Sequence, residues 1–167
     1  MGRRFGVAVI VVAGVTLTSA CSAIGDNREP WCRPVPATRL LAQSVRSASL
    51  VPCVTELPAG WAFDGFAAAD TGATFALVGP DEPASTAAVT FADACPDARG
   101  RPLRSDEDGT ELLEEVRGRS PYAATWTYRF DGGCARVDVE LAAGTGVDEV
   151  TRDLARAMSF VPRTTLT

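Results

Sequence analysis

Five cysteines constrain this 167-residue chain more than any other residues: Cys21, Cys32, Cys53, Cys95 and Cys134. None of them stands in a Cys-x-x-Cys pair, so the sequence gives no support to a thioredoxin-like redox site or a zinc ribbon. Four of the five can form two disulfides in an oxidising compartment, which leaves one thiol to be explained. The segment before Cys21 indicates both the compartment and a role for the fifth cysteine.

The first 20 residues have the three parts of a secretory signal peptide. Arg3 and Arg4 precede an apolar run that starts at Phe5, and small residues, Ser19 and Ala20, precede the cleavage point. The apolar run is shorter than the roughly 20 residues that a spanning helix needs. We therefore expect residues 1–20 to be removed on export, and keep an uncleaved anchor as an alternative.

The residues around Cys21 resemble the bacterial lipobox, in which the signal is cut before a Cys that then carries lipid. Ser19, Ala20 and Cys21 fit that pattern, whereas Thr18 stands where the family usually has Leu. The resemblance implies a lipoprotein precursor, lipidated at Cys21 and held at the outer face of the cell membrane, with residues 21–30 as a polar tether. Lipidation also accounts for the odd cysteine, and plain secretion is the other alternative.

Composition excludes several kinds of chemistry. The chain has no His and no Lys, so it cannot form a Ser-His-Asp triad, a Cys-His pair or a lysine Schiff base. It has no P-loop, GxSxG or GxGxxG motif. After residue 20 it keeps 14 arginines and 21 acidic residues, a formal charge of −7. That charge disfavours nucleic acid and attachment to an anionic lipid surface by charge, so the lipid alone is expected to hold the membrane. We expect no cofactor and no metal.

Apolar periodicity predicts one α+β domain over residues 31–163, with residues 164–167 as a tail. A short helix is expected within 38–46, and residues 96–110 are expected to be a loop. Gly65 is expected to be a bulge, because apolar residues change parity across it. Residues 111–117 fit either a strand or a helical turn, and strand is favoured. The expected strands are 61–68, 73–78, 87–92, 111–117, 124–130 and 134–141.

The last two strands form the clearest hairpin. A two-residue turn keeps their apolar faces together, and either Asp131-Gly132 or Gly132-Gly133 provides one. The second choice sets Arg129 opposite Arg136, a destabilising pair of like charges. The first sets Arg129 opposite Cys134 and uses the favoured type I′ dipeptide. We predict Asp131-Gly132.

A C-terminal helix completes the predicted fold. Val147, Val150, Leu154 and Met158 lie on one stripe, with Thr145 as its expected cap. The Phe160-Val161 pair is expected to pack back on the sheet. The predicted architecture is α+β, a mostly antiparallel sheet covered on one face by the C-terminal helix, with a short N-terminal helix and two disulfides.

Four cysteines allow three pairings, of which we predict Cys32–Cys53 and Cys95–Cys134. The first closes a loop around the short helix. The second ties the end of the 87–92 strand to the start of the strand at Cys134, off the apolar face.

Several short phrases resemble those of small uncharacterised envelope proteins of actinobacteria. The resemblance covers most of the chain after residue 20, implies an envelope location, and carries over no catalytic or binding residues. The phrases are Cys32–Pro36, Ala42–Val45, Val51–Cys53, Leu57–Trp61, Ser105–Glu107, Gly132–Cys134 and Phe160–Arg163.

Three clusters have both a structural and a functional interpretation. The carboxylates of residues 106–108, 111, 114 and 115 form a solvated acidic loop or hold a hard cation. Trp126, Tyr128 and Phe130 belong to the core or line a ligand groove. Arg99, Arg101 and Arg104 pair with nearby acids or hold an anionic group. For each cluster the structural interpretation is favoured.

The sequence predicts an envelope location and a disulfide-bonded domain but contains no catalytic motif. We therefore expect a non-enzymatic binding or accessory role at the envelope, with an unknown envelope protein as partner. The alternatives are a carboxylate-dependent hydrolase of cell-wall glycan, which needs two acids across a cleft, and a small-molecule or lipid carrier, which needs an apolar pocket.

Overall fold

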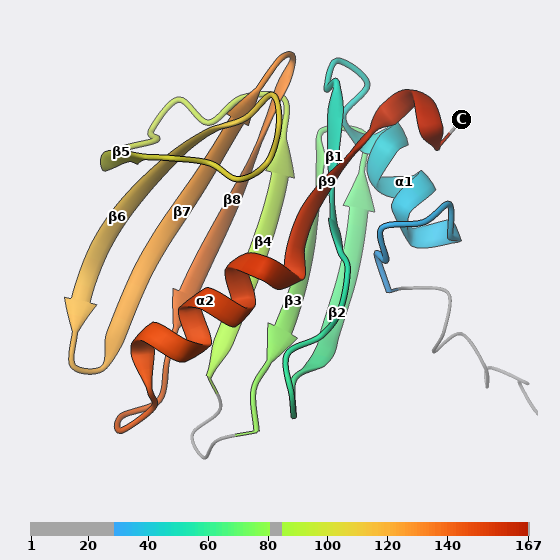
Figure 1. Cartoon of the computed structure of the whole chain (residues 1–167). Helices are drawn as coiled ribbons and strands as arrows, with labels where there is room; N and C mark the ends of the chain where they lie inside the picture. Colours follow the sequence, from blue (N-terminus) through green and yellow to red (C-terminus); the bar gives the residue numbers. More distant parts are fainter. Residues whose placement is uncertain (1–28, 81–84, 167) are drawn as a thin grey trace, which may run out of the picture.

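The computed structural model describes residues 29–80 and 85–166 (Figure 1). The expected signal peptide, Cys21 and most of the expected tether lie outside the described residues. Along the chain the elements are α1 Pro36–Ser44, β1 Leu50–Val54, β2 Ala62–Ala69, β3 Gly72–Val78, β4 Thr86–Ala92, β5 Arg101–Leu103, β6 Glu111–Arg119, β7 Tyr122–Phe130, β8 Gly133–Glu140, α2 Val147–Ala157, β9 Met158–Pro162 and the 3-10 turn η1 Arg163–Thr165.

Seven strands form one antiparallel sheet in the order β2-β3-β4-β8-β7-β6-β5. Two sequential meanders, β2-β3-β4 and β5-β6-β7-β8, are joined by the pairing of β4 with β8. Because β5 lies at the far edge, residues 93–100, the crossover segment, must pass β8, β7 and β6 to reach it. This crossover shapes the candidate site below.

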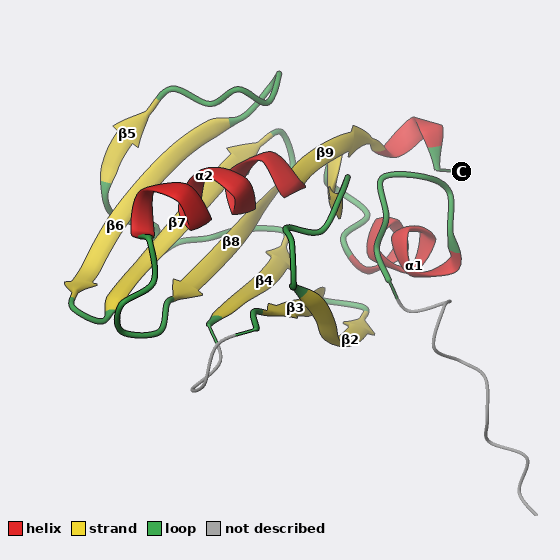
Figure 2. Cartoon of the chain, turned by 60° about the horizontal axis from the view of Figure 1, so that its bottom comes forward, coloured by secondary structure: helices red, strands yellow, loops and turns green. Residues whose placement is uncertain are grey.

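A two-stranded antiparallel ribbon of β1 and β9 lies with α1 and α2 on one face of the sheet (Figures 1 and 2). The α+β prediction, with the C-terminal helix covering one face, is therefore confirmed. We call the opposite face of the sheet the outer face. Within the described residues neither helix lies on it.

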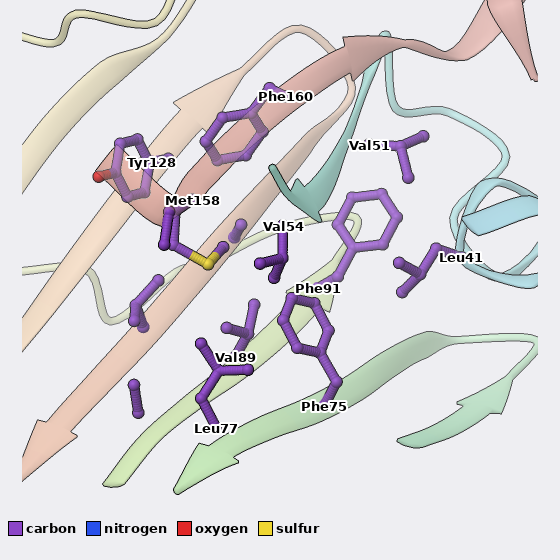
Figure 3. Packing of buried hydrophobic residues seen from close by; sticks show 14 of the residues in the cluster. Leu41, Val51, Val54, Phe75, Leu77, Val89, Phe91, Tyr128, Met158 and Phe160 are labelled. Carbon is purple, nitrogen blue, oxygen red and sulfur yellow. The ribbon is translucent and has the colours of Figure 1, made fainter. Parts of the chain in front are cut away.

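Period-two burial places the core between the sheet and these covering elements. Phe75, Val89, Phe91 and Val137 point inward from neighbouring strands and are nearly inaccessible to solvent. Leu41 of α1 meets them from the other side, as Figure 3 shows. Each such side chain contributes about 1.5–3 kcal/mol through burial.

The predicted register of the β7–β8 hairpin is confirmed. Arg129 pairs with Cys134 and Phe130 with Gly133, so Asp131 and Gly132 form the turn. Gly132 has φ +68°, and a Cβ there would collide with the carbonyl oxygen of Ser47. Glycine is thus required both by the turn and by the close approach of the α1–β1 connection.

Other predictions are confirmed with small shifts. α1 begins at Pro36, two residues before the expected start, because proline suits the first helical position. The register shifts between Phe63 and Phe66, as expected for a bulge at Gly65. Residues 111–117 are strand, the favoured alternative.

Four details differ from the expectations. Residues 101–103, expected in a loop, form β5 against β6, and β1 pairs with β9 over a long separation in the chain. The N-cap of α2 is Gly146 and makes no side-chain capping bond, so Thr145 was the wrong cap. The chain also continues past residue 163 through η1, and Leu166 is buried in the core.

Both predicted disulfides are present. Cys32 and Cys53 have Cα atoms 4.9 Å apart, and Cys95 and Cys134 have Cα atoms 6.1 Å apart. The first bridge encloses α1. The second fastens the crossover segment to the outer face, because Cys134 shares the side of β8 that carries Arg136.

Candidate functional site

The acidic cluster is dispersed by the fold. Glu107 turns inward, and its Oε2 accepts hydrogen bonds from the Ser159 hydroxyl at 3.1 Å and the Phe160 N–H at 3.2 Å. Glu114 pairs with Arg101 at 2.7 Å. Within the described ranges no group of three or more Cys, Asp or Glu side chains could hold a metal ion. Glu107 is thus not part of a solvated acidic loop: it joins the β5–β6 loop to β9, a contact that the sequence pattern did not predict.

The aromatic stripe of β7 belongs to the core. Trp126 and Tyr128 are buried, and Phe130 packs edge-on against Phe160 with ring centroids 5.5 Å apart. Burial raises the pKa of Tyr128 to about 12, and Glu107 and Asp106 add to the rise. Trp126 and Tyr128 thus pack in the core, while the half-buried Phe130 also lines the hollow described below.

The arginine cluster is divided. Arg101 is held by Glu114, and Arg104 is exposed in the loop before β6. Arg99, the third, reaches a pocket between the crossover segment and the outer face. That pocket is the site on which the remaining functional argument depends.

We call this pocket the crossover groove. Its volume is about 200 Å³. Its chemistry-bearing side chains come from the crossover segment and from four neighbouring strands: Thr90, Asp97, Arg99, Glu115, Thr125, Thr127 and Arg136.

Strand register explains why these residues meet. Thr90 of β4 pairs with Arg136 of β8, which pairs in turn with Thr127 of β7. The next row on the same face joins Asp138, Thr125 and Glu115. Alternation along each strand therefore sends two polar rows to the outer face, beneath the crossover segment.

Thr127 is the most informative of these side chains. Its residue is only 2% exposed, yet no hydrogen bond joins its hydroxyl to any residue in the part of the chain that the structure describes. No polar side-chain atom in that part is both sealed from solvent and unpaired, so the hydroxyl opens into the groove. A hydroxyl that opens into a groove without a protein partner is free to bond with water or with a ligand there.

A charged network borders the groove. Asp138 accepts hydrogen bonds from the Thr125 hydroxyl at 2.7 Å and from Arg136 at 3.0 and 3.1 Å, and Arg117 lies 3.6 Å away. Burial alone would raise the pKa of Asp138, but the Thr125 hydrogen bond and the two arginines outweigh it and lower the pKa. Asp138 therefore stays ionised and orients Arg136. A carboxyl held in this state is unsuited to donate a proton at neutral pH.

A larger hollow of about 530 Å³ lies on the other side of the Cys95–Cys134 bridge. Its charged side chains, Asp93, Glu111, Arg129 and Asp131, are all exposed. None of these charged side chains is buried, whereas Thr127 of the crossover groove is, so the crossover groove is the better candidate.

Comparison of the chain with protein-family models, with curated proteins and with solved structures found no match. None of the helices in residues 29–80 and 85–166 has the length and hydropathy needed to cross a membrane. The two disulfides are consistent with an extracytoplasmic protein.

Proposed function

We propose that this chain is an envelope lipoprotein, held by a lipid on Cys21 at the outer face of the membrane, whose domain binds a ligand and catalyses no reaction. The signal-like residues 1–20 and the lipobox-like residues before Cys21 support the location. The pairing of the other four cysteines supports it too, because Cys21 is then the one thiol left for lipid.

The crossover groove supports the binding role, and the observation that carries it is the Thr127 hydroxyl, which opens into a groove also lined by Arg99 and Arg136 and has no hydrogen-bond partner in the described residues. Guanidinium groups bind carboxylates, and a hydroxyl accepts or donates to a second polar group. Asp138 already holds Arg136, and the carboxylates of Asp97 and Glu115 also line the groove, so Arg99 is the group left to meet an anion. We therefore propose a small hydroxylated molecule with a single carboxylate as the ligand. Its volume is below the range of about 300–1,000 Å³ usual for larger ligands, which disfavours a lipid carrier.

The hydrolase alternative receives less support. Within the described residues every Asp and Glu is exposed or half-buried, and Asp138 is neutralised by arginines. A glycosidase needs one carboxyl of raised pKa facing a second across a cleft.

The anchor is tested by metabolic labelling of the full chain with a fatty-acid analogue. The wild type and the Ser22→Ala control should incorporate label, and Cys21→Ala should not. Label that persists in Cys21→Ala, or is absent from the wild type, overturns the anchor.

The groove is tested by amide chemical shifts of the processed chain with both disulfides intact. Glucuronate, glucose and acetate serve as probes, since they separate the carboxylate from the hydroxyls. Glucuronate should shift residues of the groove more than either of the others. Thr127→Val should weaken its binding about tenfold, by loss of one hydrogen bond, and Thr74→Val, on the same face outside the groove, should not. Shifts that are absent, or that lie elsewhere, overturn the groove as the site.

A further inference from the structure

The surface around α1 carries an uneven charge. Residues 30–55 contain three arginines, Arg33, Arg39 and Arg46, and no Asp or Glu, although the whole chain has a net charge of −5. All three arginines are exposed, and none forms an ion pair with the residues that the structure describes. Residues 30–55 therefore form a positively charged segment in a chain whose net charge is negative.

The exposed side of α1 is also apolar at one point. Pro36, Arg39, Leu40 and Gln43 follow helical spacing on the side that faces away from the core, while Leu41 is buried. Leu40 is 45% exposed and is one of two large hydrophobic residues that stand out from the described surface. We call Arg33, Arg39, Leu40, Gln43 and Arg46 the α1 face.

The neighbouring acids do not neutralise this face. Glu29 is engaged by Trp31, whose Nε1–H donates to its carboxylate at 3.0 Å. Asp131 meets the segment through its backbone, because its carbonyl oxygen accepts from the Ser49 N–H at 2.9 Å. Neither carboxylate forms an ion pair with the three arginines.

The α1 face lies where the described chain begins. Thr38 of α1 donates a hydrogen bond to the carbonyl oxygen of Trp31 at 2.6 Å, so the start of the domain is fixed against the helix (Figure 1). Pro30 lies nine positions after Cys21, and such a segment spans at most about 30 Å when extended. A lipid on Cys21 would therefore keep α1 within reach of the bilayer.

We propose that the α1 face rests on an anionic bilayer surface, with the arginines at the headgroups and Leu40 at the interface; this rests on the proposed lipid anchor. Each arginine near such a surface strengthens binding about fivefold. Three of them hold a free protein weakly, but an anchor raises the effective lipid concentration and makes the contact persistent. The contact gives the domain one orientation, with α1 toward the membrane.

The test uses the chain from Cys21 onward, whose four other cysteines are in disulfides, so that Cys21 can be coupled to a maleimide headgroup in vesicles. Arginine modification by phenylglyoxal is followed by mass spectrometry, in phosphatidylcholine vesicles with and without phosphatidylglycerol. Arg39 and Arg46 should react about fivefold more slowly in the anionic vesicles, and Arg119, at the far end of β6, should react equally in both. Salt near 1 M, where the Debye length is about 3 Å, should remove the difference.

Matched variants complete the test. Arg39→Gln with Arg46→Gln should abolish the protection of Arg33, whereas Arg119→Gln with Arg152→Gln should preserve it. Equal rates in the two vesicle types overturn the proposal, as does protection only in native membranes, which indicates an acidic protein partner instead. The chemical link replaces the natural lipid, so these results do not depend on whether Cys21 is lipidated in the cell. Lipidation is tested separately by the intact mass of the protein from cells: a mass without acyl chains overturns the anchor alone.

Discussion

Glu107 accepts a hydrogen bond from the backbone N–H of Phe160, a residue 53 positions further along the chain. The same carboxylate oxygen also accepts from the Ser159 hydroxyl. The loop between β5 and β6 is thereby joined to the first residues of β9.

Replacing Glu107 with Ala should lower the free energy of unfolding by about 1–3 kcal/mol, because the Phe160 N–H loses its acceptor in a half-buried place. Glu111→Ala is the matched control, since Glu111 is exposed and close by in the chain, and should cost less than about 0.5 kcal/mol. Urea unfolding measures both. Equal losses would show that the bridge contributes nothing specific.

Gly132→Ala should destabilise the protein by about 2 kcal/mol or more. An alanine there must adopt φ +68° and also displace the Ser47 carbonyl. Gly144→Ala isolates the backbone cost, because Gly144 has φ +87° with open space around it, and should cost about 1 kcal/mol. If the two variants unfold at the same urea concentration, the close approach to Ser47 is unimportant for stability.

Removing the Cys95–Cys134 bridge by paired alanines should cost about 2–4 kcal/mol and should also loosen the crossover segment. The bridge joins residues 39 positions apart and holds the crossover segment over the crossover groove. Hydrogen exchange should therefore rise in residues 93–100. Paired alanines at Cys32 and Cys53 are the control: they should lower stability too, but leave exchange in that segment unchanged. Unchanged exchange in both variants would contradict the assigned role.

Stability should fall as the pH rises between about 10 and 12, because of Tyr128. Its pKa is near 12 in the folded protein and 10.0 in its ordinary state, so the unfolded chain loses the phenolic proton first. The contribution is complete below pH 10 and is lost as the pH rises toward 12, by about 2–3 kcal/mol at most. Tyr128→Phe should remove much of this dependence, and Tyr122→Phe, which is half-buried, should retain it. Absorbance of the phenolate reports each titration, and a Tyr128 that ionises near 10 would contradict the prediction.

Local sequence was sufficient where one face of an element is buried. The register at Arg129 and Cys134 followed from alternation and from repulsion between like charges. The Cys95–Cys134 bridge followed from where two strands end, and Cys32–Cys53 from the short helix that it encloses. Sequence was insufficient for the β1–β9 ribbon, since Leu50 pairs with Pro162 across most of the domain and Pro52 is unusual in a strand.

The crossover groove could not be predicted from the sequence for a related reason. Thr127 is an ordinary strand threonine until a segment from another part of the chain covers it, and only the non-local pairing of β4 with β8 sends that segment across. Arg99 was noticed as one of a cluster, but the fold separates it from Arg101 and gives it a different neighbourhood.

The Cys32–Cys53 bridge also determines how the domain would bear mechanical load. Tension applied from the N-terminal side reaches Cys32 and passes directly through the disulfide to Cys53 in β1. The backbone of residues 33–52, with all of α1, lies inside the covalent loop and is bypassed by the bridge, so tension reaches α1 only through the Thr38–Trp31 hydrogen bond. A domain pulled between its anchor and a bound partner would thus be loaded first at β1 and its pairing with β9, while α1 keeps its shape.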